Sequence, residues 1–433
     1  MMQVRFLTLG CKTNLYESEA MAELFRKAGH TVVENSKEAE LIVINTCTVT
    51  GTGAKKSRQL IRRVRRENPK AKLAVCGCLA QTEGETLAKE IEIDILIGNK
   101  YRKNMVEYAE LAMQGVSTYA IEDILKETAF EELGIAHSQS RVRANLKIED
   151  GCNNFCSYCV IPYARGPVRS RPMEEICKEA EALGNAGYGE VVLTGIHIGS
   201  YGKDLEGSVS LMDVIEAVHQ VDGIERIRLG SLEPVTVTED FVRRAKNLSK
   251  LCPQFHMSLQ SGCDATLKRM RRRYTTNEYR KAVALLRENL TDVAITTDLM
   301  VGFSGESEEE FRESYDFCQE IGFSQMHIFP YSVRKGTAAE KLPNRVDETS
   351  KTERAGKMLA LASEMKAKFY QRYIGTTVPV LMEQKKNGWY HGTSANYMDV
   401  RVKTEKDLTG QIIPVTIKES QNEMLLGELE EEK

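Results

Sequence analysis

The sequence predicts an α/β protein with three parts: an N-terminal parallel sheet flanked by helices, a partial barrel of six βα units, and a small all-β barrel at the C-terminal end. Two successive series of alternating strand-like and helix-like segments predict the first two parts, because this alternation is typical of parallel sheets covered by helices. After residue 375 the pattern changes to short β-like runs separated by Gly, Asn and charged turns, which predicts the third part.

The first series occupies residues 1–115. Its strand candidates are residues 4–9, 41–44, 71–75 and 94–97. Amphipathic stretches such as residues 17–27 and 55–66 lie between them and predict the flanking helices. Residues 116–141 are less regular, so we expect a linker there.

The second series occupies residues 142–372. Its strand candidates are residues 146–148, 190–193, 226–229, 255–259, 294–301 and 325–329. Six βα units predict an open, partial barrel rather than a closed eight-stranded one. Apolar residues at spacings of three and four predict a final helix near residues 358–369, and residues 373–433 then form the small β domain.

Composition places the chain among soluble globular proteins, with 42% hydrophobic and 28% charged residues. No apolar run reaches the roughly eighteen residues that a membrane helix needs. The N-terminus starts in a strand candidate rather than a signal peptide, so we expect a cytoplasmic protein with no membrane partner. A net charge of −3 argues against a protein coated with nucleic acid, whereas local basic clusters suit a docked one.

Eleven cysteines need an explanation, because thiols stay reduced in the cytosol and metal binding or catalysis is then more common than disulfides. Cys152, Cys156 and Cys159 lie within eight residues, directly after a predicted strand. Soft thiolates select zinc or iron–sulfur clusters. A structural zinc site needs a fourth ligand, and no histidine or fourth cysteine follows at a suitable spacing. Three thiolates on a four-iron cluster would leave one iron open to a small molecule.

This cysteine run, Gly-Cys-Asn-Asn-Phe-Cys-Ser-Tyr-Cys, with six βα units after it resembles the radical S-adenosylmethionine (SAM) superfamily over about residues 145–329. The resemblance implies that the open iron of a 4Fe-4S cluster chelates SAM. It also implies that the reduced cluster splits SAM to a 5′-deoxyadenosyl radical, so that the cofactor supplies the difficult step.

A second set of cysteines, Cys11, Cys47 and Cys78, follows the ends of three predicted strands. Because the carboxyl ends of parallel strands meet at one crevice, these three thiols are able to converge on one ligand. The two triads together resemble the methylthiotransferase family of radical SAM enzymes over essentially the whole chain. That resemblance implies an auxiliary 4Fe-4S cluster held by Cys11, Cys47 and Cys78 that takes part in sulfur delivery. Cys76 is the ambiguous neighbour, but the family's Gly-Cys-x-x-Gln pattern falls on Cys78.

Two motifs are most similar to the branch of that family that acts on tRNA N6-threonylcarbamoyladenosine, next to the anticodon. They are Leu-Gly-Cys-Lys-Thr-Asn and the run from the first radical SAM cysteine to Val-Ile-Pro-Tyr-Ala-Arg-Gly. The product would carry a methylthio group at C2 of adenine. Rival hypotheses are action on isopentenyladenosine in tRNA, action on a ribosomal-protein aspartate, and a non-catalytic RNA-binding iron–sulfur protein. A low-potential electron donor such as flavodoxin or ferredoxin is implied for an enzyme.

By the same resemblance, SAM contacts come from the carboxyl ends of the barrel strands. The candidates are Thr194, Gly195, Ser231, Glu233, Ser258, Gln260, Asp298 and Gly302. Polar residues at this face of a barrel favour function, and glycine permits close approach of the backbone to adenine. We expect His197, His256 and His327 to be satisfied, non-catalytic histidines.

The C-terminal part resembles the TRAM domain, a small RNA-binding β-barrel, through the run Gly-Thr-Ser-Ala-Asn-Tyr at residues 392–397. Basic side chains bind phosphates and aromatic side chains stack on unpaired bases. The candidate contacts to the tRNA anticodon loop are Lys55, Arg58, Arg62, Arg271, Arg272 and Tyr397. A solvated helix face is an equally good explanation of each basic run.

Overall fold

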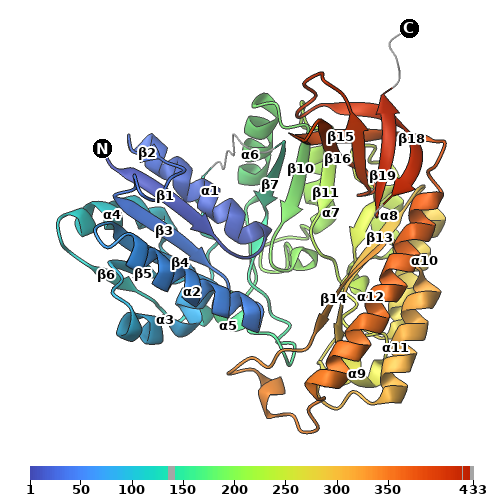
Figure 1. Cartoon of the computed structure of the whole chain (residues 1–433), viewed down its shortest axis with the longest axis horizontal. Coiled ribbons are helices and arrows are strands. Elements are labelled where there is room, and N and C mark those ends of the chain that lie inside the picture. The colour runs from blue at the N-terminus through green and yellow to red at the C-terminus, as the bar shows by residue number, and fades with distance from the viewer. Residues whose placement is uncertain (135–141, 422, 430–433) are drawn as a thin grey trace.

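The computed structural model describes residues 1–134, 142–421 and 423–429. It contains a six-stranded parallel sheet, a six-stranded open barrel and a closed five-stranded barrel (Figure 1). The predicted α/β class and its three parts are confirmed. Among the described residues, no helix is long and apolar enough to cross a membrane.

The N-terminal sheet has the strand order β2-β1-β3-β4-β5-β6. Its strands are β1 (Gln3–Thr8), β2 (Thr31–Val32), β3 (Leu41–Thr46), β4 (Lys72–Gly77), β5 (Ile95–Ile97) and β6 (Thr118–Ala120). Its helices are α1 (Lys12–Lys27), α2 (Gly51–Glu67), α3 (Cys78–Glu90) and α4 (Met105–Met113). The sheet therefore extends past residue 115, because β6 pairs with β5 in the segment that the sequence indicated as a linker. Residues 135–141 of that segment lie outside the described residues.

Strand β3 shows why this sheet forms. All six of its residues are buried, and alternate side chains enter opposite cores. Ile42 and Ile44 pack with α2 and α3, whereas Leu41 and Val43 pack with α1 and α4. Helices therefore cover both faces, which leaves the carboxyl edge of the sheet free to carry polar and sulfur-bearing side chains.

The central barrel consists of two three-stranded parallel sheets, β11-β10-β7 and β12-β13-β14. Its strands are β7 (Arg143–Lys147), β10 (Glu190–Thr194), β11 (Arg226–Leu229), β12 (Gln254–His256), β13 (Ala294–Val301) and β14 (Gln325–Pro330). Isolated parallel bridges join the two sheets, one of them between Leu232 and Met257. Every one of the six predicted strands is present.

Helices cover the outside of this barrel (Figure 1). They are α6 (Met173–Asn185), α7 (Leu211–His219), α8 (Glu239–Ala245), α9 (Asp264–Arg269), α10 (Thr276–Asn289), α11 (Glu308–Ile321) and α12 (Glu348–Gln371), whereas the short α5 (Ile161–Arg165) packs against α3 of the N-terminal part. A two-stranded hairpin, β8 (Glu149–Asp150) with β9 (Arg169–Ser170), frames the segment between β7 and α6. Short 3-10 helices lie at Arg102–Asn104, Ile124–Lys126, Ile198–Ser200, Pro234–Thr236 and Ala338–Lys341.

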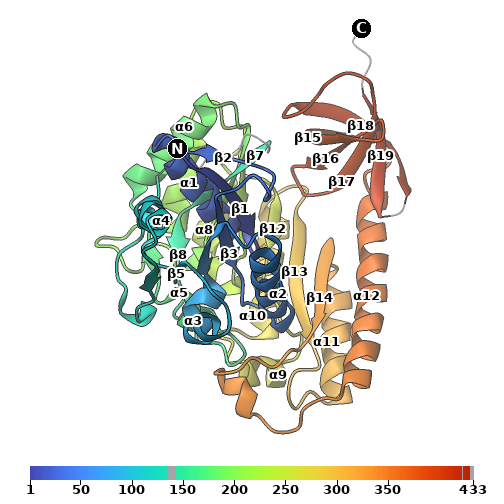
Figure 2. The same ribbon diagram turned by 60° about the vertical axis from the view of Figure 1, so that its left-hand side comes forward.

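The C-terminal barrel closes in the order β15-β16-β17-β19-β18. Its strands are β15 (Thr377–Lys386), β16 (Trp389–Ser394), β17 (Asp399–Lys403), β18 (Ile412–Gln421) and β19 (Met424–Leu429). Helix α12 leads directly into it (Figure 2). The Asn396 amide donates hydrogen bonds to Tyr373 Oη, at 2.7 Å, and to Asp292, at 3.2 Å. These bonds hold the β16–β17 turn against the central barrel.

Candidate functional site

The cysteine run of the central barrel forms a loop between β8 and α5. The pKa of both the Cys152 and the Cys159 thiol is raised to about 12, chiefly by burial and in part by Cys156, so the three sulfurs lie near one another. The Arg272 guanidinium donates a hydrogen bond of 3.3 Å to Cys156 Sγ. A cation beside a soft donor set favours bound thiolates, so the loop fits an iron–sulfur cluster.

Arg272 lies turned inward, beside the cysteine loop. Its side chain is only 7% exposed and forms a 2.7 Å ion pair with Glu233. Its guanidinium also lies 4.8 Å from the centre of the Tyr274 ring. The guanidinium is therefore engaged within the protein, next to a backbone turn at Arg271 with φ of 56°, and an RNA contact of Arg272 stays a prediction. Arg271 is exposed and stays a predicted RNA contact.

The second cysteine triad lies at the carboxyl edge of the N-terminal sheet. Cys11 is the N-cap of α1, Cys47 follows β3, and Cys78 begins α3. The pKa of Cys47 is raised to about 11, chiefly by burial and in part by the nearby Cys78 and Cys11. A Cβ on Gly10 would lie 3.2 Å from Cys47 Sγ, so the backbone passes close to the triad.

Cys76 lies inside β4 and packs in the core between the sheet, α1 and α4. The triad therefore consists of Cys11, Cys47 and Cys78. Among the described residues, no three His, Cys, Asp or Glu side chains are close enough to hold a single metal ion. A four-iron cluster binds each thiolate through a different iron, so its ligands lie farther apart than those of one ion.

A buried charge cluster connects this triad to the central barrel. Arg165, which is fully buried on α5, donates a 3.2 Å hydrogen bond from Nε to Cys78 Sγ. The same guanidinium pairs with Glu17 of α1 and donates to Asn14 Oδ1 at 2.6 Å. Arg165 therefore connects α5, the helix that directly follows the loop of Cys152, Cys156 and Cys159, to the N-terminal triad.

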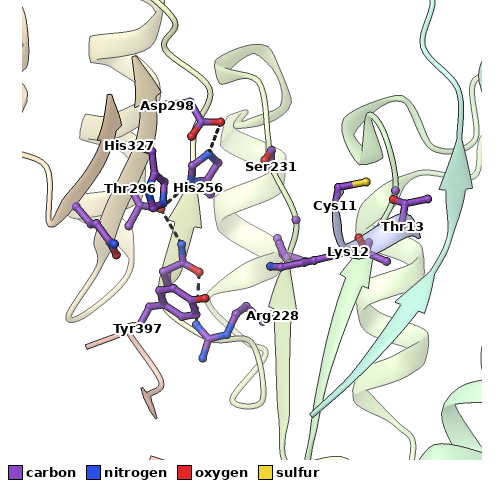
Figure 3. A pocket seen from close by; sticks show the side chains of 16 residues that line it. Cys11, Lys12, Thr13, Arg228, Ser231, His256, Thr296, Asp298, His327 and Tyr397 are labelled. Carbon is purple, nitrogen blue, oxygen red and sulfur yellow. Dashed lines mark hydrogen bonds and ion pairs between the residues drawn. The ribbon is translucent and has the colours of Figure 1, made fainter. Parts of the chain in front are cut away.

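A cavity of about 370 Å³ lies where the three parts of the chain meet (Figure 3). Its lining is Cys11, Lys12, Thr13, Thr194, Gly195, Arg228, Leu229, Gly230, Ser231, Gln254, His256, Thr296, Asp298, Gln325, His327 and Tyr397. The first three residues come from the N-terminal part, Tyr397 comes from the C-terminal barrel, and the rest come from five strands of the central barrel and the residues that follow them.

Four of the predicted SAM contacts line this cavity: Thr194, Gly195, Ser231 and Asp298. The other four do not: Glu233, Ser258, Gln260 and Gly302. Glu233 instead accepts a 3.0 Å hydrogen bond from Asn154 of the cysteine loop. At Gly302, whose φ is +70°, an added Cβ would lie 2.4 Å from the Lys351 side chain, so the close approach is to that lysine. SAM-binding roles for these four stay predictions.

The sequence reasoning missed a polar wall on the last three barrel strands. His256 Nδ1 lies 3.0 Å from Thr296 Oγ1, and His256 Nε2 lies 3.4 Å from Asp298. Burial opposes the charge on Asp298, but His256 lowers its pKa overall. The ring of His327 lies 6.1 Å from that of His256. Polar residues at every second position of β12, β13 and β14 are the signal that predicts this wall.

His197 behaves as expected of a satisfied histidine. Its Nδ1 lies 2.6 Å from Ser200 Oγ, and its Nε2 lies 3.1 Å from Glu233. It does not line the cavity.

Tyr397 occupies a backbone conformation that bulky residues rarely adopt, with φ of 70°. The Arg228 guanidinium lies 4.8 Å from its ring centre and donates to the carbonyl oxygens of Ser394 and Ala395 at 3.3 and 3.0 Å. The turn is thereby fixed so that the Tyr397 ring faces the cavity. Such local strain is a feature of functional sites.

The predicted RNA contacts on α2 differ in their availability. Arg58 forms a 2.5 Å ion pair with Glu83, and Arg62 forms a 2.6 Å ion pair with Glu90. Lys55 is exposed. The charge of this helix is therefore partly neutralised by α3, which weakens the helix as a phosphate-binding surface.

Residues 3–98 match the family described as uncharacterized protein family UPF0004, and residues 146–318 match the radical SAM superfamily. The fold is similar to that of the radical SAM methyltransferase TsrM from Kitasatospora setae, with a TM-score of 0.58 over 76% of this chain and 73% of that one, at 15% identity. The fold and the cysteine loop define a radical SAM enzyme, which uses SAM and a 4Fe-4S cluster.

The threonylcarbamoyladenosine tRNA methylthiotransferase MtaB of Bacillus subtilis (strain 168) is 40% identical over 96% of this chain and 94% of its own length. MtaB of Aquifex aeolicus (strain VF5) is 36% identical over 96% and 100%. The tRNA-2-methylthio-N(6)-dimethylallyladenosine synthase of Caldicellulosiruptor saccharolyticus is 34% identical over 98% and 91%. The chain belongs to the radical SAM methylthiotransferase family, as its two cysteine triads predicted.

Proposed function

We propose that this enzyme converts N6-threonylcarbamoyladenosine, next to the anticodon of tRNA, into its 2-methylthio derivative. The relatives named for this activity reach 40% identity over almost the whole chain, against 34% for the dimethylallyladenosine enzyme of Caldicellulosiruptor saccharolyticus. The proposal includes a second 4Fe-4S cluster held by Cys11, Cys47 and Cys78, beside the one held by the Cys152 loop.

One observation carries the proposal: a single cavity is lined by a cysteine of the N-terminal triad, by the strand ends of the barrel and by an aromatic residue of the C-terminal barrel. Methylthiolation needs a sulfur source, SAM and the target base in one place. Cys11, Asp298 and Tyr397 line the same 370 Å³ cavity (Figure 3). In the proposal, Cys11 lies beside the sulfur source, Asp298 beside SAM and Tyr397 beside the base.

The chain's own residues bind and orient the reactants. The reduced cluster at Cys152, Cys156 and Cys159 supplies radical chemistry when it is loaded, which suits an adenine C2–H that is neither acidic nor electrophilic. Ser231 and Asp298 are polar groups of the cavity wall, which supports our proposal that they bind SAM. The Tyr397 ring offers a stacking surface for an unpaired base of the anticodon loop.

Two further partners belong to the proposal. Exposed Lys55, Arg62 and Arg271 would contact tRNA phosphates, and their contribution would fall as salt concentration rises. A low-potential donor such as flavodoxin or ferredoxin would reduce the cluster. The C-terminal barrel would act as a TRAM-like RNA-binding domain.

The test is mass spectrometry of tRNA nucleosides from a host that lacks these methylthiolations, with and without this enzyme. We expect 2-methylthio-N6-threonylcarbamoyladenosine with the wild type and none with Cys11→Ala or Cys152→Ala. Appearance of the dimethylallyl product instead would reassign the substrate. A soluble, iron-loaded enzyme that cleaves SAM but leaves tRNA unchanged would refute the tRNA proposal and direct the search to ribosomal proteins.

A further inference from the structure

We propose that Lys12 forms a carboxylate-binding subsite in the cavity, which receives the threonyl carboxylate of the substrate and selects against neutral N6-alkyl adenosines. This inference rests on the proposed function and deepens it by naming the group that recognises the substrate. The relevant chemistry differs sharply between the two candidate substrates, because the threonylcarbamoyl group carries a carboxylate and the dimethylallyl group is a hydrocarbon.

Lys12 lies where such a group would enter. It is the first residue of α1 and directly follows Cys11. It lines the 370 Å³ cavity and also an adjoining cavity of about 530 Å³, and Tyr397 lines both as well. Cys11, Lys12 and Thr13 lie together on one side of the cavity, whereas His256, His327 and Asp298 lie on the other (Figure 3). A base stacked on Tyr397 would lie between these walls, within the cavity that Lys12 also lines.

The neighbouring charges are already paired with one another. Arg228 Nε lies 2.9 Å from Glu190, and Arg143 pairs with Glu383. Across the cavity, Asp298 pairs with His256, whose Nε2 lies 3.4 Å away. Within the described part of the chain, the Lys12 ammonium has no hydrogen bond or ion pair. The cavity wall therefore carries a cation that an anionic ligand would satisfy.

The local structure of α1 does not explain a lysine at this position. A positive charge in the first turn of a helix opposes the helix dipole and destabilises the helix. The first turn of α1 contains no acidic residue, and its N-cap side chain makes no capping hydrogen bond. A bound carboxylate would reverse this unfavourable interaction, because an anion is stabilised both by the ammonium and by the helix N-terminus.

The closing experiment measures RNA binding rather than turnover, on the reconstituted enzyme with SAM bound. Fluorescence anisotropy would compare three anticodon stem-loops that differ only at the target base: threonylcarbamoyladenosine, its threonine-amide analogue and unmodified adenosine. A charge-assisted hydrogen bond predicts that the wild type prefers the carboxylate RNA by on the order of tenfold. Lys12→Met should bind all three RNAs within about twofold, and Lys12→Arg should keep the preference.

Three outcomes would overturn the subsite. In the first, Lys12→Met keeps the preference for the carboxylate RNA. In the second, Lys12→Met binds all three RNAs equally more weakly, which assigns the lysine to a backbone phosphate. In the third, SAM binding measured by equilibrium dialysis falls in Lys12→Met, which assigns the lysine to the SAM carboxylate. Failure of the proposed function is distinct, since the wild type would then show no preference among the RNAs and would form no methylthio product. Lys12→Met should fold, because it removes a cation from a helix N-terminus.

Discussion

Replacement of Glu17 by glutamine tests how the N-terminal part is held against the barrel. Glu17 is fully buried on α1. It lies 2.5 Å from Arg102 of its own domain and 2.8 Å from Lys147 of β7, and it pairs with Arg165 of α5. Burial opposes its charge, but these three cations hold its pKa well below the usual range. The Glu17→Gln side chain would keep the shape and remove the charge.

The expected loss of stability follows from the charges that remain after the substitution. The three buried cations would then be left with two carboxylates, Asp150, which lies 2.7 Å from Lys147, and Glu131, which lies 2.7 Å from Arg102. Breaking a buried ion pair by neutralising one partner costs about 3–5 kcal/mol. At about 2–4 °C per kcal/mol for domains of this general size, the unfolding midpoint should fall by roughly 6–20 °C.

The assay is thermal and urea unfolding followed by circular dichroism, with Glu23→Gln on the same helix as the matched control. Glu23 forms only a surface pair with Arg26, so its replacement should change stability by about 0.5 kcal/mol or less. The difference between wild type and Glu17→Gln should shrink as pH falls below about 4. A depressed folded pKa contributes stability above the unfolded pKa and loses it as pH falls toward the folded value. Equal midpoints for Glu17→Gln and wild type would refute this account of the interface.

Three further outcomes are expected. Gly151→Ala should lower the iron content of the reconstituted enzyme by more than half, because the added Cβ would lie 1.8 Å from the Pro167 carbonyl oxygen. Gly187→Ala is the control, since Gly187 has a similar φ but open space around it, and this variant should keep its iron. Equal iron in both variants would contradict the packing argument. Tyr397→Ala should weaken anticodon stem-loop binding by about 1–3 kcal/mol in anisotropy titrations, and an unchanged affinity would remove the stacking role. Asp298→Asn should raise the dissociation constant for SAM by about tenfold in equilibrium dialysis. An unchanged dissociation constant would mean that this carboxylate serves only to orient the wall of the cavity.

The sequence predicted the central barrel well because its signals are local. Each strand is a short apolar run, and the Cys152 loop holds three ligands within eight residues, so no long-range contact has to be guessed. Local signals did not indicate the inward position of Arg272, which belongs to a basic run but contacts Cys156 and Glu233. Composition reveals the basic run, but the burial of the Arg272 side chain depends on the backbone, which has a positive φ at its neighbour Arg271.

By itself, the sequence determined the class of chemistry, since two cysteine triads and the alternation of strands and helices are visible in residue types and spacings. Only the tertiary structure decided which residues from distant parts of the chain lie next to one another. It brought Cys11 to the same cavity as Asp298 and Tyr397, three positions separated by most of the chain. Within the described residues, it also left Lys12 unpaired among paired charges. Strand register and domain packing set such contacts, and they depend on many weak interactions at once, which no short motif encodes.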